Sequence, residues 1–220
     1  MDFRFHSHRN ALELLENNPT YSGDWLELKT VVENITDQDL IRFFNLHLAT
    51  QNTKSLSGGI NRLLKHELVA QGWHAESPIF QDPEYRDDRW RLDFAKNKIA
   101  VEVAFNHGEA TSWNLIKPNL SGELNHVAKA IQTEIGIVIT ATESLKEAGG
   151  FDGAVGTYEK FLTYMKPMRQ MLTVPILLIG LEKPRTFRLT HEIVERRKRG
   201  VVTFLEDEVS VTPIQLGLGG

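Results

Sequence analysis

The chain contains no cysteine among its 220 residues. Disulfide bonds, thiolate zinc sites and cysteine nucleophiles are therefore excluded, and a bound metal would have oxygen or imidazole ligands. No run approaches about 18 uninterrupted apolar residues, and residues 1–18 lack the apolar stretch of a signal peptide. We therefore expect neither a membrane span nor a signal peptide, and a reducing cytoplasm fits the lack of cysteine.

An excess of positive charge is also missing, since 25 Lys and Arg stand against 29 Asp and Glu, for a net charge of −4. This balance does not by itself indicate nucleic-acid binding, because affinity for phosphate depends on where cations gather. They gather in residues 183–199, which include Arg196, Arg197, Lys198 and Arg199. Such a run is either a solvated surface or a contact for DNA phosphates.

The composition, 41% hydrophobic and 25% charged, is that of a globular protein, and the chain has no repeat and no Gly/Ser linker. These features favour one domain over residues 1–220. We expect a helical part over about residues 1–72, an α/β core over about 73–182 and a basic part over 183–220. Apolar spacing in the first part predicts two helices within Trp25–Thr50 and a third over Ile60–Ala70, preceded by two glycines.

The middle of the chain changes its pattern. Short, largely apolar runs at 99–105, 135–140 and 174–181 predict buried strands, and helical spacing over 120–133 and 156–171 predicts helices between them. Strands that alternate with helices indicate parallel pairing. The fold class that follows is α/β, with a central mixed β-sheet flanked by helices.

Two acidic residues lie on a predicted β-hairpin over residues 91–102, whose tight turn falls at Asn97 and Lys98. If Lys96 faces Ile99, Asp93 lies opposite Glu102, with Cβ atoms about 4.5–5.5 Å apart. Two carboxylates so placed repel each other unless a proton or a cation lies between them, and hard divalent cations prefer oxygen ligands. The pair is thus a candidate Mg²⁺ site. A sheet edge with two unrelated acids would give the same spacing.

The residues around D-x8-E-V-x-F resemble the catalytic hairpin of the BglII/BstYI-like restriction endonucleases, which belong to the PD-(D/E)xK nuclease superfamily. Further segments resemble that family in the same order: KHELVAQGW, HAESP, GIVIT, GTYEKF and VPILLIGL. Together they cover roughly residues 60–182. The resemblance implies a restriction-endonuclease-like fold.

The resemblance also implies site residues. Asp93 and Glu102, with the backbone carbonyl of Val103, would hold Mg²⁺, and Glu76 would match a further polar position of the active site. Glu76 could equally be a solvated acid in a loop.

Ala104 departs from the family pattern, because the residue two after the second acid is usually Lys, sometimes Glu or Gln, and orients or activates the attacking water. A methyl group can do neither. Three explanations are open: the chain is an engineered inactive variant, the natural enzyme supplies the missing group from elsewhere in the chain, or the protein is a catalytically silent relative. Nearby candidates for a replacement are Lys117, Glu123 and Asn106.

For DNA recognition, Asn106 and His107 match positions that lie close to the bases in BglII-like enzymes. The glycine-rich loop with Asp152 and Gly153 resembles a second base-reading segment, and it is equally consistent with a plain connection. A basic run similar to residues 196–199 occurs near the end of BglII.

The function implied is that of a type II restriction endonuclease: Mg²⁺-dependent, sequence-specific hydrolysis of double-stranded DNA at a short palindrome, of which a central GATC is one form. Palindromic DNA is read most simply by a symmetric protein, so we expect a homodimer. The genetic partner would be a cognate DNA methyltransferase. The alternatives are a non-catalytic DNA-binding protein on a nuclease scaffold and a DNA nuclease outside restriction.

Overall fold

The structure, a computed structural model, describes residues 1–50, 53–123, 127–194 and 196–205. Its α-helices are α1 (Ala11–Asn17), α2 (Pro19–Asn34), α3 (Asp37–Thr50), α4 (Ser57–Ala70), α5 (Thr111–Gly122), α6 (Glu143–Ala148) and α7 (Tyr158–Met168). Its strands are β1 (Phe3–His8), β2 (His74–Pro78), β3 (Arg91–Lys96), β4 (Ile99–Ala104), β5 (Ile135–Ala141), β6 (Ile176–Leu181), β7 (Phe187–Val194) and β8 (Arg197–Phe204). Short 3-10 helices cover η1 (Pro83–Tyr85), η2 (Asp88–Trp90) and η3 (Gly108–Ala110).

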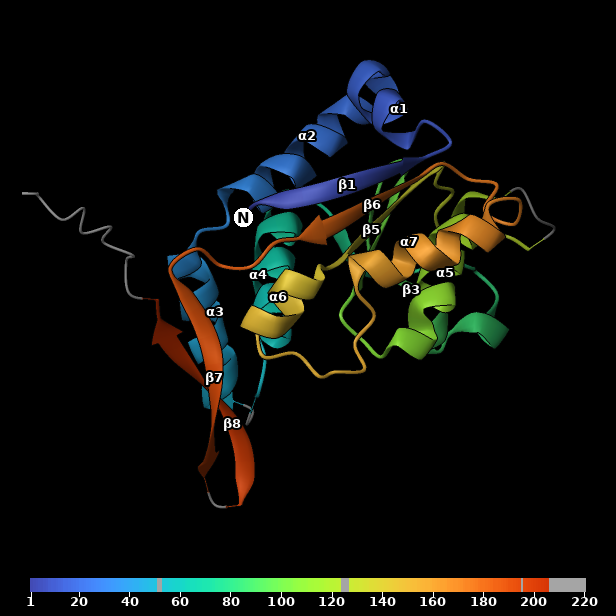
Figure 1. Ribbon diagram of the computed structural model, residues 1–220. Coiled ribbons are helices and arrows are strands. Elements are labelled where there is room, and N and C mark those ends of the chain that lie inside the picture. Colours follow the sequence, from blue (N-terminus) through green and yellow to red (C-terminus); the bar gives the residue numbers. More distant parts are fainter. Residues whose placement is uncertain (51–52, 124–126, 195, 206–220) are drawn as a thin grey trace, which may run out of the picture.

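Six strands form one sheet in the order β1-β6-β5-β4-β3-β2 (Figure 1). β4, β5 and β6 are parallel, because the chain crosses over through helices between them, whereas β1, β2 and β3 pair antiparallel with their neighbours. The sheet is thus mixed, as the sequence predicts. β1 lies outside the predicted strands, and it ties the start of the chain to the edge of this sheet.

Helices cover both faces of the sheet. The larger core, which includes Leu64 of α4, Phe94 of β3 and Val101 of β4, lies on the face covered by the N-terminal helices. The other face carries Ala104 and Val138, which pack with residues of α5 and α7. Because side chains alternate between faces along a strand, β4 contributes to both cores.

The helices predicted in the first part of the chain are present. α3 begins with a reciprocal cap, in which Thr36 Oγ1 accepts from the Asp39 N–H at 3.1 Å and Asp39 Oδ2 accepts from the Thr36 N–H at 3.0 Å. α4 begins three residues earlier than predicted and includes both glycines. A Cβ on Gly59 would lie 2.8 Å from the backbone nitrogen of Phe44, so glycine permits α3 and α4 to pack closely.

The helix predicted over 120–133 is wrong: the helix is α5, over Thr111–Gly122, and residues 127–133 are not helical. Backbone hydrogen bonds join that later segment to the strand-like residues 79–81, from Gln81 N to Ala128 O at 2.9 Å and from Ala130 N to Ile79 O at 3.0 Å. Hydrogen bonding to these residues, which are distant in sequence, therefore outweighs the local apolar spacing that predicted a helix.

β7 and β8 form a separate two-stranded sheet that projects from the body beside α3 (Figure 1). His191 of β7 and Gly200 of β8 are anchored to the backbone carbonyls of Lys54 and Thr53, at 3.0 and 3.1 Å. None of the helices in the described part of the chain is long and apolar enough to cross a membrane.

Candidate active site and DNA interface

The hairpin β3–β4 has the register that the sequence predicts. Phe94 pairs with Val101, Ala95 with Ala100 and Lys96 with Ile99. Asn97 adopts φ 48°, the left-handed conformation that this tight turn needs. The register that would have separated the two acids onto opposite faces is therefore not the one adopted.

Asp93 follows directly on these pairs, and it is its side chain that hydrogen-bonds to the backbone of β4. Its Oδ2 accepts the backbone N–H of Val103 at 2.6 Å. The carboxylate is therefore held against β4, beside Glu102. The family resemblance implies that the Val103 carbonyl is a metal ligand; here the Val103 N–H fixes Asp93, and the role of the carbonyl stays a prediction.

Glu102 is buried, with 2% of its side chain exposed. Its Oε2 forms an ion pair with Lys117 Nζ at 2.5 Å, whereas its Oε1 is buried and has no partner among the described residues. Burial, and secondly the negative charge of Asp93, raise the pKa of Glu102 well above its usual value, and Lys117 offsets part of that effect. A buried oxygen without a hydrogen-bond partner destabilises the protein, so it marks a position where a bound ligand would be stabilising.

Burial also raises the pKa of Asp93, although the N–H of Val103 and the charge of Lys117 act in the opposite direction. Two desolvated carboxylates side by side, one with a free buried oxygen, are a donor set that fits Mg²⁺. No group of three or more His, Asp or Glu side chains suited to a metal occurs in residues 1–50, 53–123, 127–194 and 196–205. Mg²⁺ commonly uses only one or two carboxylates and completes its shell with water and phosphate.

Glu76 lies near this pair but is not buried with it. β2 and β3 pair in one register on either side of Glu76, which places Glu76 opposite Asp93. Its φ of 52° interrupts the pairing of β2 with β3, and its side chain, 57% exposed, forms a weak ion pair with Lys65 at 3.8 Å. Glu76 and Asp93 line a small cavity of about 90 Å³, and the Glu76 charge raises the pKa of Asp93.

Ala104 is 1% exposed and packs in the core with Leu115, Val138 and Tyr158. It lies two residues beyond Glu102 on the same face of β4, as expected. Of the three candidate replacements, Lys117 contacts Glu102. The side chain of Asn106 instead accepts a hydrogen bond from Asn114 at 2.8 Å, and the charge of Glu123 acts on Lys129.

The two loops expected to read bases lie side by side, although about 45 residues separate them in the sequence. The Gly108 N–H donates to Ala154 O at 2.7 Å, the Gly156 N–H donates to Asn106 O at 3.1 Å, and His107 bridges to Val155. The side chains of the first loop, Asn106 and His107, are exposed, as are the tip residues Asp152 and Gly153 of the second. The first loop directly follows the end of β4 that carries Glu102, and the second follows α6.

The basic run lies on the β7–β8 hairpin. Arg196, Arg197 and Lys198 are exposed at and after its turn, and Arg199 is half-buried. Arg196 has φ 64°, the left-handed conformation of a tight turn. The hairpin projects on the opposite side of the molecule from α5, so these cations do not belong to the immediate surroundings of the acid pair (Figure 1).

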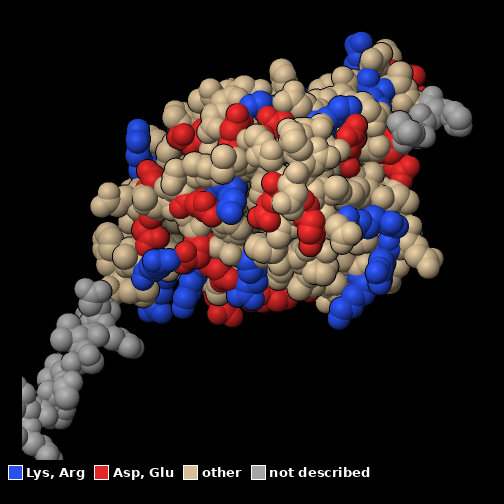
Figure 2. All heavy atoms as spheres, turned by 90° about the horizontal axis from the view of Figure 1, so that it is seen from above, with Lys and Arg blue, Asp and Glu red and all other residues tan. Residues whose placement is uncertain are grey.

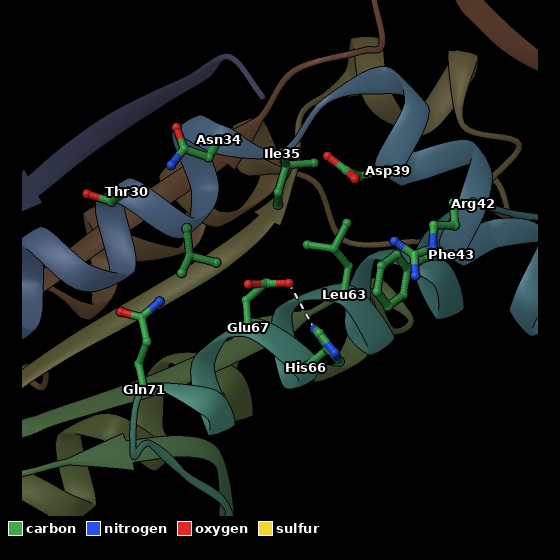
Figure 3. Close-up of a pocket in the computed structure, with 11 residues that line it drawn as sticks. Thr30, Asn34, Ile35, Asp39, Arg42, Phe43, Leu63, His66, Glu67 and Gln71 are labelled. Carbon is green, nitrogen blue, oxygen red and sulfur yellow. Dashed lines mark hydrogen bonds and ion pairs between the residues drawn. The ribbon is translucent and has the colours of Figure 1, made fainter.

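Other cavities and surfaces add little to this candidate site. A cavity of about 290 Å³ lies between α2, α3 and α4, where His66 and Glu67 are hydrogen-bonded at 2.8 Å, and none of the expected site residues lines it (Figure 3). Figure 2, which views the molecule from above, shows acidic and basic side chains interspersed on that face. That face therefore presents no continuous basic surface for a DNA duplex.

The sequence and the fold are both similar to those of known proteins. The family model for restriction endonuclease BglII/BglIII matches residues 3–181. The crystal structure of restriction endonuclease BglII complexed with a DNA 16-mer is similar, with a TM-score of 0.63 and 20% identity, covering 93% of this chain and 100% of that one. The structure of free BglII has a TM-score of 0.51 and 18% identity, with the same coverage. No curated protein matches the sequence.

The fold is that of a restriction-endonuclease-like protein. Since the family model spans most of the sequence, the chain belongs to the BglII/BglIII restriction endonuclease family.

Proposed function

We propose that this protein is a type II restriction endonuclease that hydrolyses double-stranded DNA at a short palindrome and requires Mg²⁺. The observation that carries the proposal is the pair of desolvated carboxylates, Asp93 and Glu102, of which Glu102 has an Oε1 without a partner in the described part of the chain. Family membership supports the same reaction class.

Asp93, Glu102 and the Val103 carbonyl would hold the metal. Bound there, Mg²⁺ lowers the pKa of water and offsets charge on the scissile phosphate. In the reaction the water oxygen bonds to phosphorus, the bond to the 3′ oxygen breaks, and that oxygen leaves as a hydroxyl. The N–H of Val103 keeps the Asp93 carboxylate fixed throughout, so the metal finds a preformed pair and not a mobile side chain. Glu76, opposite Asp93 on β2, would suit a contact with the metal or with water.

Recognition would come from the two joined loops, with Asn106 and His107 on one and Asp152 and Gly153 on the other. Asn106 and His107 can donate and accept hydrogen bonds at base edges, Asp152 can accept them, and Gly153 lets the backbone approach a groove. The cations 196–199 would bind phosphates, which position the protein without reading sequence. A homodimer would present two copies of these loops to a palindrome, one with a central GATC being the form to test first.

In a cell this enzyme would act in the cytoplasm beside a methyltransferase that protects the same sites. A second candidate, a DNA-binding protein without catalysis, is favoured by one observation, the methyl group at Ala104.

The test is plasmid cleavage with Mg²⁺, with DNA binding measured in parallel in Ca²⁺. Discrete fragments support the proposal, and mapping their ends gives the site. Random degradation would indicate a nuclease outside restriction. Binding without any cleavage in Mg²⁺ or Mn²⁺ would favour the non-catalytic alternative.

A further inference from the structure

Lys117 is a part-buried cation to which neither the hairpin motif nor the family match assigns a role. It belongs to α5, 15 residues after Glu102, and only 11% of its side chain is exposed. Removing a Lys side chain from water is costly unless its charge is paired. Its Nζ pairs with Glu102 Oε2 at 2.5 Å and donates to the backbone carbonyl of Arg91 at 3.0 Å.

These two contacts place the ammonium at a particular point of the hairpin. The pairs of β3 and β4 end at Phe94 and Val101, so Arg91 lies further along β3, toward the end of the hairpin where β4 reaches Ala104. Lys117 Nζ, which bridges Arg91 O and Glu102, therefore lies toward that end of the hairpin. A lysine two residues after the second acid would direct its ammonium to this region, on the same face of β4.

Close packing of α5 on the sheet positions Lys117 beside Glu102. The next residue, Pro118, lies against β5 at Gly136, where a Cβ would be only 2.7 Å from the Pro118 Cβ. Leu115, on the same helix, belongs to the same buried core cluster as Ala104. The small residue at 104 and the glycine at 136 together leave the space that lets α5 bring its lysine to the acid pair.

We propose that Lys117 supplies the positive charge that the strand motif lacks at Ala104, and acts as a catalytic residue by donating hydrogen bonds to the scissile phosphate. This inference rests on the proposed function. Paired with Glu102, the ammonium is a donor, so it offsets charge on a non-bridging phosphate oxygen. With this role for Lys117, Ala104 is a natural feature of an active enzyme and not an inactivating substitution.

The test compares Lys117→Met, which keeps much of the side chain but removes the charge, with Lys117→Arg, which keeps the charge. The control is Lys96→Met. Lys96 lies on the same hairpin and pairs with Glu27 at 2.5 Å, so it reports the loss of a similar Lys–Glu pair away from the acids. Three quantities are measured: single-turnover cleavage in Mg²⁺, DNA affinity in Ca²⁺, and Ca²⁺ affinity by calorimetry.

We expect Lys117→Met to cleave about 100-fold or more slowly, the range for loss of one donor to developing charge. DNA affinity stays within about threefold, because one of many phosphate contacts is lost. Ca²⁺ binds as tightly or more tightly, since a cation beside Glu102 has gone. Lys117→Arg keeps an intermediate rate, and Lys96→Met cleaves like the parent protein.

Unchanged cleavage by Lys117→Met would overturn the inference. Loss of Ca²⁺ binding together with cleavage would also overturn it, because Lys117 would then only hold Glu102 in place. If Lys117→Met does not fold, Lys117→Arg decides: a rate at least about tenfold lower with Ca²⁺ binding kept supports the role, and an unchanged rate refutes it. Absence of cleavage by the parent protein would instead refute the proposed function, and the catalytic role with it.

Discussion

Replacing Asp93 by Asn should make the metal-free protein more stable and the enzyme inactive. Asn keeps an oxygen that can accept the Val103 N–H, so the bond of 2.6 Å that fixes this side chain survives. It removes one of the two negative charges, whose mutual repulsion contributes to the raised pKa of Glu102. The two effects of one substitution thus have opposite signs.

The magnitude follows from the geometry. Opposed residues on paired strands have Cβ atoms about 5 Å apart, and two charges at that distance repel by about 3 kcal/mol at an effective dielectric constant of 20. The Lys117 ammonium offsets roughly half of this, which leaves about 1–2 kcal/mol. For a chain of this length that free energy raises Tm by about 2–8 °C.

The assay is thermal unfolding in EDTA and in Ca²⁺, beside plasmid cleavage in Mg²⁺. In EDTA the variant melts higher than the parent protein. Ca²⁺ raises the Tm of the parent protein more, because a ligand stabilises only the state that binds it. The control Asp88→Asn removes an acid that is 91% exposed and pairs with Arg91, and should change both readouts little.

Cleavage by Asp93→Asn at the parental rate would refute the metal-ligand assignment. A lower Tm in EDTA would refute the reasoning about repulsion, because it would mean that the charge of Asp93 is satisfied within the protein alone.

Three further predictions concern other parts of the molecule. Ala104→Gln should cost about 1–3 kcal/mol of stability, because position 104 is fully packed, and should not increase cleavage, as assayed by melting and plasmid digestion; faster cleavage would contradict this. Neutralising residues 196–198 should weaken DNA binding and reduce the slope of log K against log salt by about 3 for each subunit of the proposed homodimer, with the cleavage rate of bound complexes unchanged; an unaltered slope would show that the hairpin does not bind phosphates. Hydrogen bonds from Tyr21 and Lys98 hold the pKa of Glu134 below its usual 4.5, so Glu134 stabilises the fold above pH 4.5 and this contribution is lost as pH falls through the lowered pKa. Glu134→Gln should therefore be less stable than the parent at pH 7, by at most about 1 kcal/mol because the side chain is part-exposed, and the difference should shrink below pH 4.5 in urea unfolding; a constant difference would be evidence against it.

Sequence alone determined the features that depend on neighbours along the chain. The hairpin register followed from the turn at Asn97 and from the alternation of side chains, and this local pattern is enough to bring Asp93 and Glu102 together on one face. The three apolar runs became β4, β5 and β6, because a strand buried on both faces needs an apolar side chain at nearly every position. The cap at Thr36 likewise involves residues only three positions apart.

The tertiary structure decided what depends on docking between distant elements. Apolar spacing wrongly predicted a helix over 120–133, because backbone partners at residues 79–81 take up that later segment. No sequence pattern within either loop predicts that the loops at 106–108 and 152–156 lie side by side. The pairing of Lys117 with Glu102 depends on how α5 lies across β4, which is set by small residues at 104 and 136 and not by any spacing in the motif. Periodicity describes which face of an element is buried, whereas the partner that covers that face is chosen by packing over the whole fold.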